Sequence, residues 1–299
     1  MTLDQLRIFV DVAERENMTR AAEALRLTQS AVSGAVSALE TRHGVALFHR
    51  VGRRIELTQD GRTFLEEARS VLRSAAAADQ VLSELRGLKR GRINIHASQT
   101  TASYWLPERL ARFKARHPQI IINVVIENTT QVISAVVDGA AELGFIEDSV
   151  RVDALRAWPV HQDHLTIVVH AKHPWAKLRR RLKAAEIYSA KWVMRERGSG
   201  TRAVFEDVLR RDGIKPERLH ISLELPSNEA VRAAVEAGAG ATAISQVVVR
   251  SGLASGQLGT VPFRSIERPF LALVHRERRA SFAVRDFIEE ISPMRPTSL

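Results

Sequence analysis

The chain reads MTRAAEALRLTQSAVSGAVSALETR over residues 18–42, and this stretch decides the fold of its N-terminal part. The spacing of the apolar residues predicts a short helix over about 19–25, a tight turn, and a second helix capped by the Thr28 hydroxyl. We expect the second helix to turn four apolar side chains toward the core: Ala31, Val32, Val36 and Leu39. Its outer face then carries only small or polar residues, namely Gln29, Ser30, Ser33, Gly34 and Ser37. A helix with such a face can approach another surface closely.

Arginines cluster just after this second helix. Gly44 ends the helix, and residues 45–58 alternate as two short strands that turn at about 51–53, which predicts a wing. A helix-turn-helix with a basic wing is typical of proteins that read duplex DNA. We therefore predict double-stranded DNA as a partner. The expected contacts come from Thr28, Gln29, Ser30, Ser33, Ser37, Arg50, Arg53 and Arg54.

These side chains suit two kinds of contact. The Gln29 amide can pair with the N6 and N7 atoms of adenine, so it is the candidate base reader. Serine hydroxyls bond bases or phosphates, and the wing arginines Arg53 and Arg54 suit the minor groove or flanking phosphates. Gly34 and Ala35 offer no side-chain hydrogen bond. The alternative for each residue alone is a solvated side chain.

Composition narrows the classes further. A net charge of +10 favours polyanionic partners. The absence of cysteine excludes disulfides and thiolate metal sites. No apolar run reaches the roughly 20 residues that span a bilayer, and the acidic, amphipathic N-terminus is not a signal peptide, so a cytoplasmic location without membrane contact is expected. Neither a cofactor nor a metal site is predicted, since the neighbouring His161, His164, His170 and His173 straddle a strand and its turn.

Residues 58–87 predict a long helix with a small, apolar seam at three- and four-residue steps. Such a seam favours a partner helix, which predicts a homodimer; the alternative is that the seam packs against its own N-terminal domain. Residues 87–91 are expected to form a hinge. Beyond it strands and helices alternate, which predicts α/β layers with parallel sheets. The expected strands lie at 92–98, 120–127, 142–147, 165–169, 191–194, 220–225, 240–244 and 270–274, and the helices at 108–117, 131–138, 202–211, 228–237 and 282–291.

The whole chain resembles a LysR-type transcriptional regulator. Three N-terminal stretches carry the resemblance: LRIFVDVAE, MTRAAEALRLTQSAVSGAVSALE and GVALFHRVGRRIELTQDG. Three C-terminal stretches agree with it: ASQTTASYWLPERLARFKARHPQ, ENTTQVISAVVDGAAELGFIED and SNEAVRAAVEAGAGATAIS. The resemblance implies an α/β protein overall, with a helical winged helix-turn-helix at 1–58 and a dimerisation helix and hinge at 59–90. It also implies a two-lobed effector domain at 91–299, similar to periplasmic binding proteins, with lobe I at about 91–162 and 268–299 and lobe II at about 163–267.

The expected effector contacts lie in turns between strands and helices, where helix N-termini present free N–H groups. Hydroxyls in these turns and nearby arginines (Arg195, Arg197 and Arg202) predict a small organic or inorganic anion. The candidates are Ser98, Gln99, Thr100, Thr101, Thr129, Ser199, Gly200, Thr201 and Asn228. The alternative is ordinary N-capping, which alone would explain each hydroxyl.

The leading prediction is a non-enzymatic, sequence-specific DNA-binding regulator whose promoter contacts respond to this effector. The resemblance adds a homotetramer on DNA, and RNA polymerase is a candidate partner. A second class is a small-molecule-binding protein whose N-terminal domain is an interaction module. A third is an enzyme built on the α/β part, but no Ser-His-Asp order, paired-carboxylate pocket or nucleotide fingerprint supports it.

Overall fold

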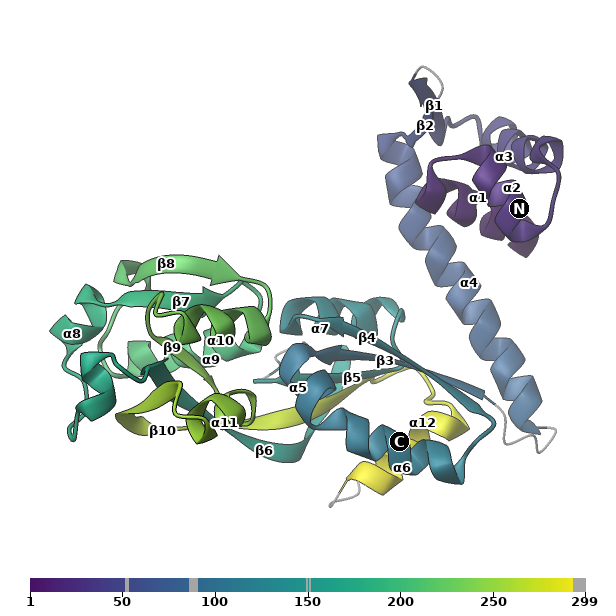
Figure 1. Ribbon diagram of the computed structural model, residues 1–299. Coiled ribbons are helices and arrows are strands. Elements are labelled where there is room, and N and C mark those ends of the chain that lie inside the picture. The colour runs from purple at the N-terminus through teal and green to yellow at the C-terminus, as the bar shows by residue number, and fades with distance from the viewer. Residues whose placement is uncertain (52–53, 86–90, 149, 151, 293–299) are drawn as a thin grey trace. The chain divides into compact units, whose positions relative to one another are not determined.

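The computed structural model describes residues 1–51, 54–85, 91–148, 150 and 152–292. The chain forms two compact units, Met1–Arg86 and Gly87–Leu299, and each is described by itself (Figure 1). Among the described residues, none of the helices has the length and apolarity needed to cross a membrane.

The N-terminal unit begins with three helices whose ends follow from local chemistry. They are α1 (Leu3–Arg15), α2 (Met18–Leu25) and α3 (Gln29–His43). Thr2 and Gln5 form a capping box on α1, Asn17 caps α2, and the Thr28 hydroxyl accepts a hydrogen bond from the Ala31 amide at the start of α3. Gly44 ends α3 with a φ of +64°. The predicted helix-turn-helix is therefore confirmed.

A two-stranded wing follows α3. Strands β1 (Phe48–Val51) and β2 (Arg54–Leu57) pair antiparallel. The Glu40 side chain on α3 accepts hydrogen bonds from the amides of Leu47 and Phe48, which fixes the wing to the helix. The predicted turn of the wing, with Arg53, lies outside the described residues.

Helix α4 (Gln59–Leu85) joins this unit at its first turns. The Thr58 hydroxyl accepts from the Gly61 amide and donates to the Ala46 carbonyl, 2.8 Å away. Gly61 is required there because a Cβ atom would clash with the Leu47 carbonyl oxygen. Leu65 and Ala68 are buried with residues of α1 and the wing. Farther along, Val71 is 41% and Leu82 is 60% exposed.

The C-terminal unit is built on a six-stranded sheet with the order β4-β3-β5-β10-β6-β9 (Figure 1). Its strands are β3 (Gly91–Ser98), β4 (Ile120–Glu127), β5 (Leu143–Glu147), β6 (Leu155–His170), β9 (Thr242–Ser245) and β10 (Leu258–His275). Strands β4, β3 and β5 are parallel, whereas β10, β6 and β9 join by antiparallel pairing. A second sheet pairs β7 (Lys191–Arg195) with β8 (His220–Leu225) in parallel. The predicted parallel pairing therefore holds for β3, β4 and β5 and for β7 with β8, and it was wrong for β10, β6 and β9.

Helices cover both sheets. Those expected are α6 (Leu106–Arg116), α7 (Thr129–Asp138), α9 (Gly200–Arg211), α10 (Asn228–Glu236) and α12 (Phe282–Ile291). The sequence did not predict α5 (Gln99–Tyr104), α8 (Ala184–Ser189), α11 (Gln246–Ala254) or the 3₁₀ turns η1 (Pro174–Lys177) and η2 (Pro216–Arg218). All but α11 are no longer than six residues, too short to show a helical period.

The hydrophobic core of this unit divides into two groups. One group, called lobe I here, takes its residues from 93–160 and 270–291, and the other, called lobe II, takes them from 165–266. Strands β6 and β10 pair along nearly their whole length and pass through both lobes. The exact lobe boundaries given above remain predictions.

Candidate functional site

The outer face of α3 is open to solvent, as the sequence predicts. Thr28, Gln29, Ser30, Gly34 and Ser37 are exposed, and Ser33 is half-buried. A Cβ atom added at Gly34 would meet nothing within 4 Å, so no described residue packs over this position. A flat polar helix face of this kind can enter a groove of another molecule.

Ala31 is a correction to the predicted core. Val32, Val36 and Leu39 are buried, but Ala31 is exposed. It sits in the first turn of α3, where its amide donates to the Thr28 hydroxyl at 3.2 Å. The Thr28 and Ser30 hydroxyls also share a hydrogen bond of 3.0 Å, so two of the candidate contacts are held together at the helix N-terminus.

The wing places two candidate arginines on paired strands. Arg50 of β1 lies opposite Ile55, and Arg54 of β2 lies opposite Val51. Arg42, in the last turn of α3, and Arg62, in the first turns of α4, are exposed. Arg42 and Arg62 therefore add exposed positive charge to the N-terminal unit.

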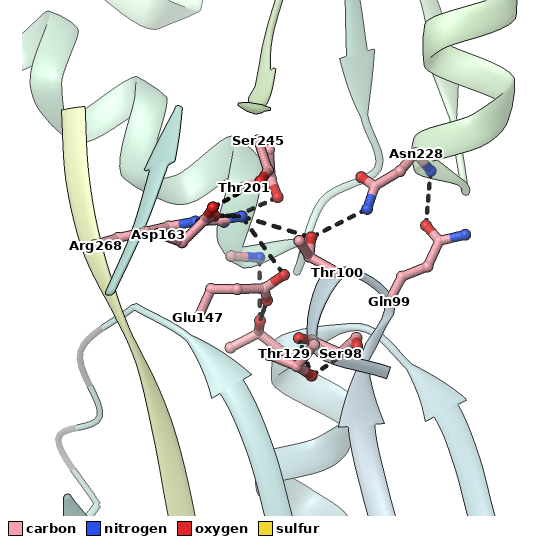
Figure 2. A network of polar contacts seen from close by, with 12 residues as sticks. Ser98, Gln99, Thr100, Thr129, Glu147, Asp163, Thr201, Asn228, Ser245 and Arg268 are labelled. Atoms are coloured by element: carbon pink, nitrogen blue, oxygen red, sulfur yellow. Dashed lines mark hydrogen bonds and ion pairs between the residues drawn. The ribbon is translucent and has the colours of Figure 1, made fainter. Parts of the chain in front are cut away.

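Arg268 lies at the centre of a buried polar network between the lobes (Figure 2). This β10 residue is 1% exposed. Two nitrogens of its guanidinium lie close to Oδ2 of Asp163 in β6: Nε at 2.8 Å and Nη2 at 2.7 Å. Nη1 donates to Thr201 Oγ1 at 3.0 Å, and Nη2 lies 3.5 Å from Thr100 Oγ1. Ser245 of β9 donates to the other oxygen of Asp163 at 2.7 Å.

Glu147 brings a second carboxylate to this network from the end of β5. It is 2% exposed, and its Oε1 lies 3.7 Å from Nη2 of Arg268. The Thr129 hydroxyl lies 3.4 Å from its other oxygen. Burial raises the pKa of Glu147, but Arg268 and hydrogen bonds from the Thr100 and Ser98 hydroxyls outweigh burial, so the pKa lies below its ordinary value of 4.5. The group is therefore ionised at neutral pH.

Beside this centre, Asn228 of lobe II forms hydrogen bonds to residues of lobe I. Its Nδ2 donates to Thr100 Oγ1 at 3.0 Å, and its backbone amide donates to Gln99 Oε1 at 2.7 Å. The Gln99 amide group in turn donates to Glu229 Oε2 at 2.7 Å. Arg195 donates to Asn228 Oδ1 at 2.6 Å, so each polar atom of the Asn228 side chain has a partner.

Gly200 makes a second connection at the start of α9. Its amide donates to Thr129 Oγ1 at 3.1 Å. A Cβ atom here would clash with the Glu147 carbonyl oxygen, so only glycine allows this approach. The nearby Thr130 amide donates to the Gly198 carbonyl at 3.3 Å.

Ordinary capping does not explain all the predicted hydroxyls. Ser98 and Ser199 occupy N-cap positions but make no side-chain capping bond, although both are buried. Thr101 has a structural role, since its hydroxyl donates to the Ser98 carbonyl at 2.8 Å. The structure thus gathers Ser98, Gln99, Thr100, Thr129, Gly200, Thr201 and Asn228 around the network.

Sequence reasoning missed the charged centre: Glu147, Asp163, Ser245 and Arg268 were not candidates. The available signal was a charged residue at the end of, or inside, a largely apolar strand, as in LGFIE at 143–147. Two arginines expected near an anion are already paired: Arg195 with Glu196 at 2.8 Å, and Arg202 with Glu206 at 2.7 Å. Within the described part of the chain, no three His, Asp or Glu side chains gather as a metal site would require.

Comparison with known families gives two matches that together cover most of the chain. Residues 3–62 match the family described as "Bacterial regulatory helix-turn-helix protein, lysR family". Residues 86–294 match the "LysR substrate binding domain".

Similar proteins agree along the full length. The HTH-type transcriptional regulator YeiE of Escherichia coli (strain K12) is 33% identical, over 98% of each chain. A probable RuBisCO transcriptional regulator of Synechocystis sp. is 30% identical over 98% of this chain and 86% of its own. The crystal structure of full-length CbnR with its target DNA shares the fold, with a TM-score of 0.71, 22% identity, and coverage of 97% of this chain and 99% of that one.

The two family matches identify the chain as a DNA-binding transcriptional regulator with an effector-binding domain. The chain belongs to the LysR family of transcriptional regulators.

Proposed function

We propose that this regulator binds specific double-stranded promoter sites through α3 and the wing, and that a small effector bound between lobes I and II changes these contacts. The observation that carries the first part is the uncovered face of α3, with Gln29 and Ser37 exposed along it. The buried network that links both lobes carries the second part.

The proposed DNA contacts divide into reading and positioning. Gln29 reads a base edge, since its amide can both donate and accept at adenine. Thr28, Ser30, Ser33 and Ser37 bond bases or phosphates along the groove. The wing arginines Arg50, Arg53 and Arg54 hold the flanking backbone. The fold shared with CbnR, whose crystal structure was solved in complex with its target DNA, supports DNA as the partner.

The proposed effector is a small organic or inorganic anion acting as co-inducer. Hydroxyls of Thr100, Thr129 and Thr201, the N-terminus of α9 and the guanidinium of Arg268 are the donors that support it. The regulatory domain of CcmR from Synechocystis PCC6803 was solved in complex with 2-PG and shares the fold, with a TM-score of 0.61 and 23% identity over 68% of this chain and 96% of that one. Ser98, Gln99, Thr101, Ser199, Gly200 and Asn228 complete the proposed site.

We further propose a homodimer through α4 and a homotetramer on DNA, acting in the cytoplasm, with RNA polymerase as a candidate partner. Exposed Val71 and Leu82 support pairing along α4. Effector binding shifts the relation of the lobes, and thereby the spacing of the DNA-binding units, if one arrangement binds the effector more tightly.

The test is equilibrium binding to the gene's own upstream region and to a scrambled duplex, followed by fluorescence anisotropy. Gln29→Ala should weaken binding to the specific site by about 1–3 kcal/mol while leaving the scrambled duplex unchanged. Gln246→Ala makes the same change at an exposed position in the other unit and should alter neither affinity. Equal affinity of the wild-type protein for both duplexes would refute the proposal.

A further inference from the structure

The donors that would hold an anion between the lobes already hold carboxylates of the protein itself. Glu147 accepts from the Thr129 hydroxyl and lies 3.7 Å from Nη2 of Arg268, and Asp163 takes two donors of Arg268. Figure 2 shows both carboxylates near the Arg268 guanidinium. The two carboxylates therefore already take donors that a bound anion would need.

Negative charge exceeds positive charge among the buried side chains of this centre. Two buried carboxylates face one guanidinium, which grips Asp163 closely and lies 3.7 Å from Glu147. The guanidiniums of Arg195 and Arg202, two of the arginines expected near an anion, are paired with glutamates. A ligand that carries only negatively charged acceptor oxygens would meet Glu147 without compensation, and like charges in a buried site repel strongly.

An oxyanion that keeps a proton avoids this repulsion, because it can donate a hydrogen bond to Glu147. Its O–H can donate to Glu147, while its other oxygens accept from threonine hydroxyls, which can turn to donate. A hydrogen bond to an ionised carboxylate is among the stronger kinds. The N-terminus of α9, which reaches Thr129 through the Gly200 amide, favours an anion over a cation at the same place.

Resting on the proposed function, we propose that Glu147 determines effector specificity: the interlobe site takes a small oxyanion that retains a proton to donate to Glu147 and rejects one that offers only acceptors. Glu147 is thus a binding residue in addition to the hydroxyls. The rejection comes from its charge, and its removal should admit the excluded class.

Isothermal titration calorimetry on the full-length protein tests this with two probes of similar shape at pH 7 and constant ionic strength. Inorganic phosphate keeps at least one proton under these conditions, whereas sulfate keeps none. The wild-type protein should bind phosphate at least tenfold more tightly than sulfate. Glu147→Gln, whose amide can donate to sulfate, should bind sulfate at least tenfold more tightly than the wild type and lose the preference.

Two further variants complete the design. Glu267→Gln makes the same change in charge at an exposed residue adjacent to Arg268 in sequence and should leave the preference intact. Glu147→Asp keeps the carboxylate and should still reject sulfate, which provides a readout even where the glutamine variant fails to fold. Equal wild-type affinities for the two anions, an unchanged preference in Glu147→Gln, or no binding of either anion by any variant overturns the inference.

Anisotropy with promoter DNA on the same preparations separates this inference from the proposed function. Loss of specific DNA binding with the anion preference retained would refute the proposed function and leave the role of Glu147 standing. Specific DNA binding without an anion preference would refute only the role of Glu147.

Discussion

Arg268 is a charged side chain almost without access to water, and its place in the core depends on its partners. Asp163 supplies the close ion pair, Glu147 supplies a second negative charge, and Thr201 fills a further donor direction. A buried charge of this kind is tolerated only while it is paired and hydrogen-bonded. Removing one of these side chains leaves the remaining buried charge without a partner.

Arg268→Met should therefore lower the free energy of unfolding by about 3–5 kcal/mol, because two buried carboxylates lose their counter-charge. Denaturant titration of the full-length protein measures the change. Arg250→Met alters an exposed residue of α11 and should stay within about 0.5 kcal/mol of the wild type. Equal stability of the two variants would contradict this account.

Glu147 also predicts a dependence of stability on acid. Its pKa in the folded protein lies below the ordinary value, because Arg268 and the hydroxyls of Thr100 and Ser98 outweigh burial. The ionised group therefore adds stability above the ordinary pKa of 4.5, and this stability is lost as the pH falls through the folded pKa. Denaturant titrations from about pH 6 to pH 3 should show a shallower loss in Glu147→Gln than in the wild type. Parallel curves would contradict the prediction.

At the scale of residues, sequence reasoning located half of the interlobe centre. Hydroxyl residues lie at the junctions between strands and the following helices: Ser98, Thr100, Thr129 and Thr201. Such positions can be predicted from an apolar run followed by hydroxyl residues. The charged residues of the centre could not be predicted from such a pattern. Arg268 and Asp163 are 105 positions apart, and only the pairing of β10 with β6 brings them together.

Helix α4 serves two purposes along its length. Its first turns belong to the core of the N-terminal unit, through Leu65 and Ala68. Its later turns leave Val71 and Leu82 exposed on one face by helical periodicity. A long helix with exposed apolar residues gains most of its stability from packing against a partner.

Leu82→Glu should weaken dimerisation at least tenfold, since burying a leucine is worth about 1.5–3 kcal/mol and a charge in the seam adds repulsion. Sedimentation velocity measures the dimer, and promoter affinity should fall with it because two half-sites are no longer bound together. Ala76→Glu places the same charge on another face of α4 and should leave the dimer intact. Dimers unaffected by Leu82→Glu would place the interface elsewhere.

Helices and strands with a regular apolar period could be predicted from the sequence. Strands that pass from one lobe to the other could be predicted only in part. Helices α1 to α3 show caps and apolar stripes in the sequence. Strands β6 and β10 were predicted only at 165–169 and 270–274, yet they run over Leu155–His170 and Leu258–His275. Polar stretches around Asp163 and Arg268 interrupt their apolar pattern where the strands pass between the lobes.

Over the whole C-terminal unit, apolar side chains remain exposed at the edges of both sheets. Strand β4 ends the order of the six-stranded sheet and exposes Ile121 and Ile126, and Leu223 is exposed on β8. Exposed edge strands of this kind pair readily with another chain. This arrangement agrees with the proposed tetramer.

Ile126→Lys should convert tetramers to dimers, because a charge on the β4 edge opposes association between effector-binding units while α4 still pairs. Mass photometry at several protein concentrations distinguishes the two species. Thr260→Lys adds the same charge at an exposed position of β10 and should leave the assembly unchanged. A variant that remained tetrameric would exclude the β4 edge from the interface.

The topology of lobe I has a consequence for synthesis on the ribosome. Residues of lobe II interrupt lobe I, whose sheet and core are closed by Phe270–Leu273 of β10 and by α12. The nascent chain therefore delivers a finished N-terminal unit early and an effector-binding unit only near the end of translation. A message cut short before β10 would yield a fragment that keeps the N-terminal unit but lacks the strand and helix that complete the effector-binding unit.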